Sequence, residues 1–331
     1  MTSSVAQPSP SGDSLKRKGA SFSNATLAAL IVAGLAFGYL VFILPYAAGY
    51  GDYRKPVIQW LLTSWQDPTW QHGILTPFIA GFLIWRKRKS LAKIPLKPSY
   101  LGLLGIACCL FGYWVGYRGN FYFIGYASLQ FLMAGIVLWL CGWRFFWAVS
   151  FAWLILGFAW PYLFLEDTLA FKLRYLMVTT TSWLLNHVGL DTIQDGTRLI
   201  SAATTERAQG QWFDLNVDGP CSGLRSLFAL MMVSTLFSYF RQRSWWRRLL
   251  LFTLSFPLAI VANMARILIL IFASIFFGQE FAVGRGDEYT SNFHLLTGIF
   301  VYIVALGGLI LGEKMLHKIF GFEKPLPLSR E

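Results

Sequence analysis

Charged residues are scarce in this chain of 331 residues. Only 13% are Asp, Glu, Lys or Arg, whereas 56% are hydrophobic and 17% are aromatic. Apolar runs recur along the whole chain, and no polar segment between them is long enough for a separate soluble domain. The composition therefore indicates a single integral membrane domain and excludes an ordinary soluble enzyme.

The chain also lacks the motifs of several common chemistries. It has only four cysteines and four histidines, with no C-x-x-C pair, no H-E-x-x-H, no G-x-S-x-G and no Walker loop. We therefore expect no metal site and no cofactor. A disulfide is not expected either. Cys108 and Cys109 fall near the middle of a predicted span, whereas Cys141 falls at the inner face of the membrane.

The apolar runs approach the roughly 20 residues that a helix needs to cross a bilayer. The first run follows Lys16-Arg17-Lys18 and is longer than the core of a signal peptide, about 7–15 residues, so we interpret it as a membrane helix. The pattern predicts an all-α, polytopic fold with about eight transmembrane helices. These cover residues 26–46, 71–85, 100–117, 121–140, 145–164, 221–240, 247–277 and 293–313.

The segments outside these spans complete the predicted organisation. Residues 1–25 are rich in Ser and Pro and predict a disordered cytoplasmic tail, residues 26–313 form the membrane domain, and 314–331 form a short cytoplasmic tail. Segment 168–188 is apolar but interrupted by charges, which favours a helix along the membrane interface and leaves a crossing open. The polar stretch 189–219 is expected outside the bilayer.

Lys and Arg in the short loops give the orientation. Under the eight-span topology the basic clusters fall on one side, which the positive-inside rule assigns to the cytoplasm. These clusters are 16–18, 86–89, Arg144, 241–248, Lys314 and Lys318. The net charge of +12 is explained by this topology and by anionic lipid, so no nucleic-acid partner is expected.

One cysteine stands at the predicted outer membrane surface. Cys221 follows Pro220, which is favourable at the first position of a helix, so its thiol is expected at a helix N-terminus. The helix dipole there favours the thiolate, and Arg225 at i+4 adds a positive charge, while Asp218 opposes both. This setting is typical of a nucleophilic cysteine.

Two further ionisable residues interrupt predicted spans, where such residues are costly and usually functional. Arg266 lies within the seventh span, and His294 opens the last span on the outer side. Both can therefore converge with Cys221 in the outer half of the bilayer. A thiolate, an imidazole and a guanidinium supply the nucleophile, the general acid and the oxyanion partner of acyl transfer.

These residues stand in a recognisable order. The blocks Cys221-Ser-Gly-Leu-Arg225, Asn263-Met-Ala-Arg266 and His294, with Gly298 after it, resemble the exosortase/archaeosortase family of membrane cysteine transpeptidases. An earlier block, His72-Gly-Ile-Leu-Thr-Pro77, is also similar to that family. The resemblance implies that Cys221, Arg266 and His294 are catalytic.

The resemblance also implies a substrate and a location. Family members act at the outer face of the cytoplasmic membrane on exported proteins with PEP-CTERM-like sorting signals, which end in a transmembrane helix and a basic tail. The cleaved protein would form a thioester with Cys221 before transfer to an acceptor. Membrane lipid is the other expected partner.

Alternatives remain at several positions. Arg266 could be a structural charge, Arg225 could only reach to the interface, and His294 could merely cap a helix. His72 could belong to an aromatic belt or contact substrate. The residues Ser222, Gly223, Asn263, Arg225 and His72 are interpreted as supporting or substrate-binding. The alternative function is a non-enzymatic transporter or exopolysaccharide export component, which needs polar groups along a pathway but no nucleophile.

Overall fold

The computed structural model describes residues 24–47, 53–205, 207–217, 224–285 and 289–321. Its helices are α1 (Asn24–Gly38), α2 (Val57–Ser64), α3 (Thr76–Arg86), α4 (Arg88–Leu91), α5 (Tyr100–Gly119), α6 (Tyr122–Cys141), α7 (Trp143–Leu156), α8 (Leu163–His187), α9 (Leu224–Arg241), α10 (Trp245–Phe277), α11 (Gln279–Ala282) and α12 (Asn292–Phe320). Its strands are β1 (Pro45–Ala47), β2 (Arg54–Pro56), β3 (Thr192–Asp195), β4 (Arg198–Ser201), β5 (Asp214–Asn216), β6 (Gly284–Arg285) and β7 (Tyr289–Thr290).

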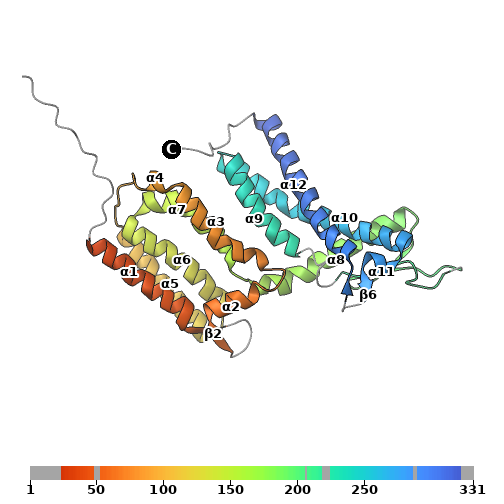
Figure 1. The fold of residues 1–331 in the computed structure, drawn as a ribbon, viewed down its shortest axis with the longest axis horizontal. Coiled ribbons are helices and arrows are strands. Elements are labelled where there is room, and N and C mark those ends of the chain that lie inside the picture. The colour runs from red at the N-terminus through yellow and green to blue at the C-terminus, as the bar shows by residue number, and fades with distance from the viewer. Residues whose placement is uncertain (1–23, 48–52, 206, 218–223, 286–288, 322–331) are drawn as a thin grey trace, which may run out of the picture.

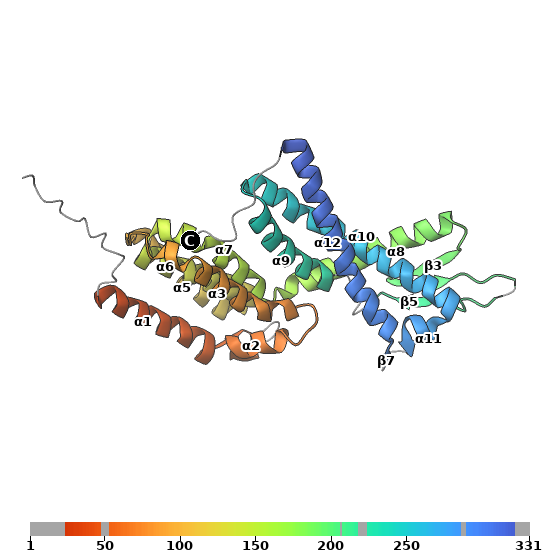
Figure 2. The same ribbon diagram turned by 45° about the horizontal axis from the view of Figure 1, so that its top comes forward.

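The helices form two groups (Figure 1). In the first group α5 packs against α6, and α7 packs against both α6 and α3. In the second group α10 packs against α9 and α12, which cross it as Figure 2 shows. The groups meet where the ring of Phe151 on α7 stacks on Tyr239 of α9, with ring centroids 3.6 Å apart. The predicted all-α membrane fold is confirmed, and small antiparallel sheets add to it.

The candidate membrane spans of the structure differ from the eight predicted. Within the described residues, five helical segments are long and apolar enough to cross a membrane: 24–43, α5, α6, α10 and α12. A bent pair, α7 with its 3₁₀ end and α8, would make a sixth if it forms one span. Helix α3 has 11 residues, about 16 Å at helical rise, which is shorter than the roughly 30 Å bilayer core. The predicted count of eight is therefore not confirmed.

The predicted span 145–164 and the following segment are divided differently in the structure. The helical chain that starts at Trp143 ends at Ala159, and α8 starts at Leu163, bent by 67° from it. Trp160 adopts an extended conformation before Pro161, as expected for a residue preceding proline. Residues 163 and 164 thus belong to α8, which also contains most of segment 168–188.

The polar stretch after α8 folds into a three-stranded antiparallel sheet of order β3-β4-β5. Strands β3 and β4 are joined by a two-residue turn whose first residue, Gly196, has φ of 60°, a conformation that glycine adopts easily. Leu199 and Leu215 are buried in a cluster with Ile267 and Leu270 of α10. The sheet is thereby held beside the end of α10 that also lies near α11 (Figure 2).

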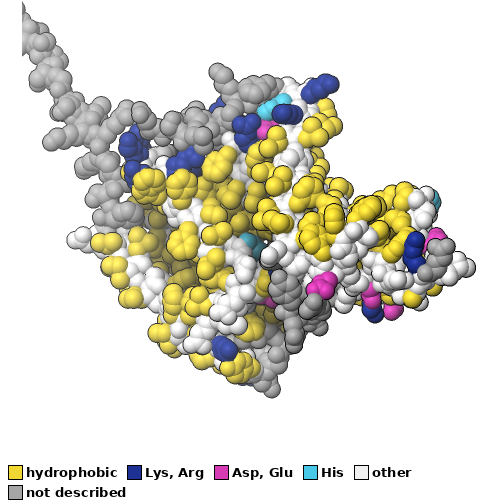
Figure 3. Space-filling view, turned by 45° about the vertical axis from the view of Figure 1, so that its right-hand side comes forward, with side chains coloured by type: hydrophobic (Ala, Val, Ile, Leu, Met, Phe, Trp, Pro, Cys, Tyr) yellow, Lys and Arg dark blue, Asp and Glu magenta, His cyan; other side chains and the backbone are white. Residues whose placement is uncertain are grey.

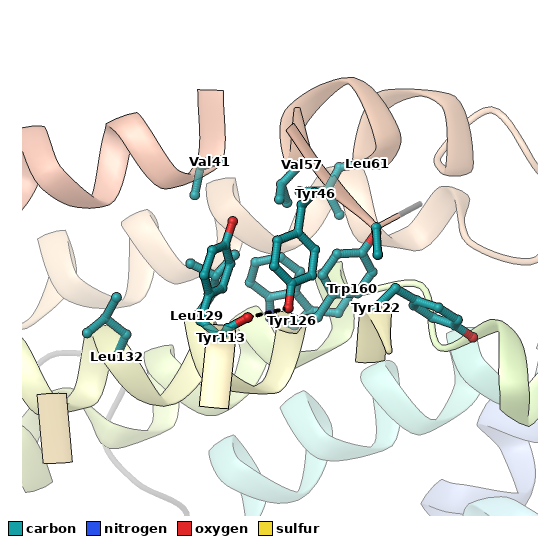
Figure 4. Close-up of a cluster of buried hydrophobic side chains, with 11 residues drawn as sticks. Val41, Tyr46, Val57, Leu61, Tyr113, Tyr122, Tyr126, Leu129, Leu132 and Trp160 are labelled. Carbon is teal, nitrogen blue, oxygen red and sulfur yellow. Dashed lines mark hydrogen bonds between the residues drawn. The ribbon is translucent and has the colours of Figure 1, made fainter. Parts of the chain in front are cut away.

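A tyrosine cluster joins the β1–β2 pair to the first helix group (Figure 4). Tyr46 of β1 is fully buried, and its hydroxyl donates to the carbonyl of Tyr113 on α5 at 2.8 Å. A Cβ atom at Gly125 of α6 would lie only 2.2 Å from the Tyr46 ring. Glycine is therefore required here, because any side chain would collide with this buried ring.

The charged side chains separate along the molecule. Figure 3 shows hydrophobic side chains over the middle of one face, most Lys and Arg at its upper edge and most Asp and Glu in its lower half. At the basic end, Arg241 of α9 pairs with the buried Glu313 of α12 at 2.7 Å. His294 lies at the other end of α12. The separation fits a protein that crosses a membrane with one basic side.

Candidate active site

Two of the predicted residues meet between α10 and α12. The Arg266 side chain donates from Nε to Thr297 Oγ1 and from Nη2 to the backbone carbonyl of His294, both at 3.2 Å. Thr297 Oγ1 also donates to that carbonyl at 2.7 Å. All three residues are buried, with exposed fractions of 8% or less. The predicted convergence of Arg266 and His294 is therefore present.

The start of α12 holds His294 in this position. Ser291 is the N-cap of the helix, and its Oγ accepts from the backbone N–H of His294 at 3.0 Å. The same hydroxyl donates to the carbonyl of Ala282 at the end of α11. Such a cap is worth roughly 1 kcal/mol of helix stability. It also fixes the first turn of α12, and with it His294, against the preceding segment.

Asn263 connects the same face of α10 to α9. Its Nδ2 donates to Ser226 Oγ at 2.5 Å and to the carbonyl of Ala259 at 2.8 Å. Asn263 is three residues before Arg266, a spacing that puts both side chains on one helical face. Helix α10 therefore carries adjacent polar groups, of which Asn263 binds to α9 and Arg266 binds to α12.

The predicted nucleophile lies outside the described residues, together with Ser222 and Gly223. The first described residue after them is Leu224, which is buried at the start of α9. Arg225 follows and is half-buried. Helix α9 packs against both α10 and α12. The start of α9 thus faces the helices that carry Arg266 and His294.

His72 lies in a different environment. It sits in a 3₁₀ turn, residues 71–75, that precedes α3. Its ring packs near Phe228 of α9 and Trp70, with centroid distances of 6.2 and 6.3 Å. The indole N–H of Trp70 donates to Glu166 Oε2 of α8 at 3.0 Å. His72 therefore flanks the first turns of α9 within an aromatic cluster.

Several contacts of the site were not predicted. Thr297 could have been found, because it follows His294 by three residues and so lies on the same helical face. Glu166 could have been noticed as a carboxylate beside apolar spans. Ser226 gave no signal of its own. In the described part of the chain, no three His, Cys, Asp or Glu side chains are grouped as metal ligands would be.

Comparisons with known proteins identify the family. A family model described as transmembrane exosortase matches residues 64–311. The comparisons with curated proteins and with solved structures find no match. The matched region contains Cys221, Arg266 and His294 and most of the membrane domain. The predicted resemblance is thereby confirmed, and this multi-pass membrane chain belongs to the transmembrane exosortase family.

Proposed function

We propose that this protein is a cysteine transpeptidase that removes C-terminal sorting signals from exported proteins and transfers them to an acceptor. Its substrates carry a C-terminal transmembrane helix and basic tail, in the manner of PEP-CTERM proteins. Family membership supports a role in protein sorting. The observation that best supports the proposed reaction is the buried hydrogen bond from Arg266 to the backbone carbonyl of His294.

In the proposed reaction the Cys221 thiolate attacks the carbonyl carbon of the scissile peptide bond. The tetrahedral oxyanion collapses, the C–N bond breaks, and His294 gives a proton to the leaving amine. The exported protein is then held on Sγ as a thioester. An acceptor nucleophile attacks this thioester, gives up its proton to His294 and releases the Cys221 thiolate.

The proposed role of Arg266 is to stabilise the oxyanion. A guanidinium is always charged and presents several donors in a fixed plane, so it suits an oxygen that becomes negative only during the reaction. The bonds to Thr297 and to the His294 carbonyl already hold the guanidinium in place next to His294. The guanidinium therefore need not become ordered when the oxyanion forms. Such pre-organised donors are worth roughly 100 to 1,000-fold in rate each.

Chain connectivity supports the inclusion of Cys221. Three residues of extended chain span at most about 11 Å, so Cys221 is tied to within that distance of Leu224. Two residues beyond Leu224, Ser226 is bonded to Asn263 of α10. Asn263 shares a helical face with Arg266. The nucleophile is thus tethered to the helix that carries the proposed oxyanion partner.

We assign this site to the extracytoplasmic side of the cytoplasmic membrane. His294 is at the start of α12, whereas His317 and Lys318 lie in its last turn. Arg241 lies at the end of α9, which starts near the site. Because Lys and Arg concentrate on the cytoplasmic side, the opposite ends of these helices face outward.

A membrane-impermeant thiol reagent tests the proposal. Applied to intact host cells, it should stop removal of the C-terminal segments, because it alkylates an outward-facing Cys221. A variant in which Cys108, Cys109 and Cys141 are alanine should remain equally sensitive, since these cysteines are not part of the reaction. Unchanged processing, while a cysteine introduced into the β3–β4 turn is labelled from outside, would refute the outward thiol.

A further inference from the structure

An apolar groove lies outside the proposed catalytic centre, in the first helix group. It is a cavity of about 330 Å³ between α1, α3, α6 and α7, lined by hydrophobic side chains and one glycine. The lining includes Gly34, Ile84, Val137, Phe146 and Leu156. This cavity, the α1 groove, falls at the lower end of the range of about 300–1,000 Å³ that is usual for small-molecule sites in proteins.

The groove exists because α1 packs loosely. Helix α1 lies at the edge of the first helix group (Figure 1) and contributes no buried residue. Its lining residues, which also include Leu30, Ala33 and Phe37, recur at the spacing of one helical face. On that face, a Cβ atom placed at Gly34 would meet no atom of a neighbouring helix within 4 Å. The protein therefore leaves this face of α1 partly uncovered.

The groove has the length of one lipid leaflet. On α7 its lining runs from Phe146 to Leu156, which is about 15 Å at helical rise and about half of the roughly 30 Å hydrocarbon core of a bilayer. It begins within one turn of the start of α7 and, at Ile84, within one turn of the end of α3. The groove therefore extends from the basic run 86–89 toward the middle of the membrane.

The volume of the groove distinguishes an acyl chain from a helix. A helix about 10 Å wide and 15 Å long occupies roughly 1,200 Å³, several times the volume of the groove. A transmembrane helix of a partner, or of a second copy of this protein, would therefore require α1 to move away. An acyl chain is narrower and flexible, and in a membrane it supplies the dispersion contacts that an empty groove would lack.

The opening of the groove carries a positive charge. Lys87 follows Ile84 by three residues and so lies on the same helical face. Its ammonium donates to the carbonyl of Ala148, the residue before Val149 of the groove, at 2.8 Å, and an ammonium has two further donors. The stretch 68–165 is rich in Lys and Arg but contains no Asp or Glu. An anion that balances this charge must therefore come from outside this stretch.

We propose that the α1 groove binds one acyl chain of an anionic phospholipid, from the leaflet at the basic end of the molecule, and that Lys87 pairs with the phosphate of this lipid. The acyl chain fills the space between α1 and α7, while the headgroup stays beside the basic run 86–89. The bound lipid thereby holds α1 against the rest of the first helix group. The site is separate from Arg266 and His294 and does not depend on the proposed reaction.

Native mass spectrometry of the delipidated, detergent-solubilised full-length protein tests the site. The probes are dioleoyl phosphatidylglycerol and the phosphatidylcholine with the same acyl chains. The wild type should bind one phosphatidylglycerol about fivefold more tightly than phosphatidylcholine, the effect of roughly one basic residue beside an anionic lipid. Lys87→Gln should abolish this preference. Lys89→Gln, which removes the same charge from an exposed residue of the same basic run, should retain it.

A variant that fills the groove tests its apolar part. Gly34→Leu should weaken the binding of both lipids by about tenfold or more, because the new side chain occupies the groove. Gly38→Leu is the matched control, since Gly38 is in the same helix, has equal room for a side chain and does not line the groove. Phosphatidylglycerol should raise the melting temperature of the wild type and of Gly38→Leu but not that of Gly34→Leu. A cooperative melting transition shows that each variant is folded.

Three results would overturn the proposal. Equal affinity of the wild type for the two lipids would show that no anionic headgroup is recognised. Binding by Gly34→Leu that matches the binding by Gly38→Leu would place the acyl chain elsewhere on the protein. A wild-type dimer that Gly34→Leu dissociates would assign the groove to a second copy of the protein instead of a lipid.

Discussion

Replacing Cys221 by alanine is expected to abolish the processing of exported proteins. The variant lacks the sulfur atom on which the proposed covalent intermediate forms, so the rate should fall by more than about a thousandfold. In host cells, mass spectrometry of envelope proteins should detect intact C-terminal helices and basic tails that are absent from the wild type. The protein itself should insert normally, because one small side chain replaces another.

The matched control is Cys141→Ala, which removes a free, buried cysteine at the end of α6. It should leave processing unchanged. Normal processing in a stable, correctly inserted Cys221→Ala protein would show that Cys221 is not the nucleophile. The chain would then be better explained as a non-enzymatic transporter or export component, since such a protein needs polar groups along its pathway but no thiol.

The second large effect is expected from Arg266→Lys. Lysine keeps the positive charge but cannot bind Thr297 and the His294 carbonyl in the planar geometry that arginine uses. The oxyanion partner would be misplaced, and processing should slow by about 100-fold. The measurement is the rate at which a pulse-labelled substrate loses its C-terminal segment, together with the melting temperature of the purified variant.

Arg241→Lys is the control for this prediction. Arg241 also bonds through Nε to a buried partner, Glu313, but it lies at the basic end of the bundle, away from His294. Arg241→Lys should lower the melting temperature about as much as Arg266→Lys does. It should leave the processing rate within about twofold of the wild type. If Arg266→Lys processes substrate as fast as Arg241→Lys, then Arg266 has a structural role only.

The sequence supports the prediction of Arg266 and His294 because ionisable residues in apolar spans are rare and costly. Their convergence was expected from the predicted topology, and it is present because α10 and α12 pack against each other. The bond between Asn263 and Ser226 could not be predicted, since it depends on how α9 and α10 rotate against each other. Nothing in the sequence around Ser226 indicates that rotation.

The local sequence also does not determine where the membrane helices end or bend. Pro161 is visible in the sequence, but a proline can either kink a span or end it. In the structure the chain bends by 67° between α7 and α8, and α8 packs against α10 and β3, contacts that no local sequence signal records. Strands β3 to β5 are short and were hidden within a polar stretch, where alternation extends over too few residues to predict a sheet.

The most direct test of the central claim is detection of the acyl-enzyme. The purified full-length protein would be incubated with a substrate protein that accumulates uncleaved in Cys221→Ala cells, without added acceptor, then quenched in acid and digested. We predict that the Cys221 peptide carries the new C-terminus of the substrate through a thioester that neutral hydroxylamine releases. Substrate cleavage with no adduct on Cys221, at any time during turnover, would contradict the mechanism.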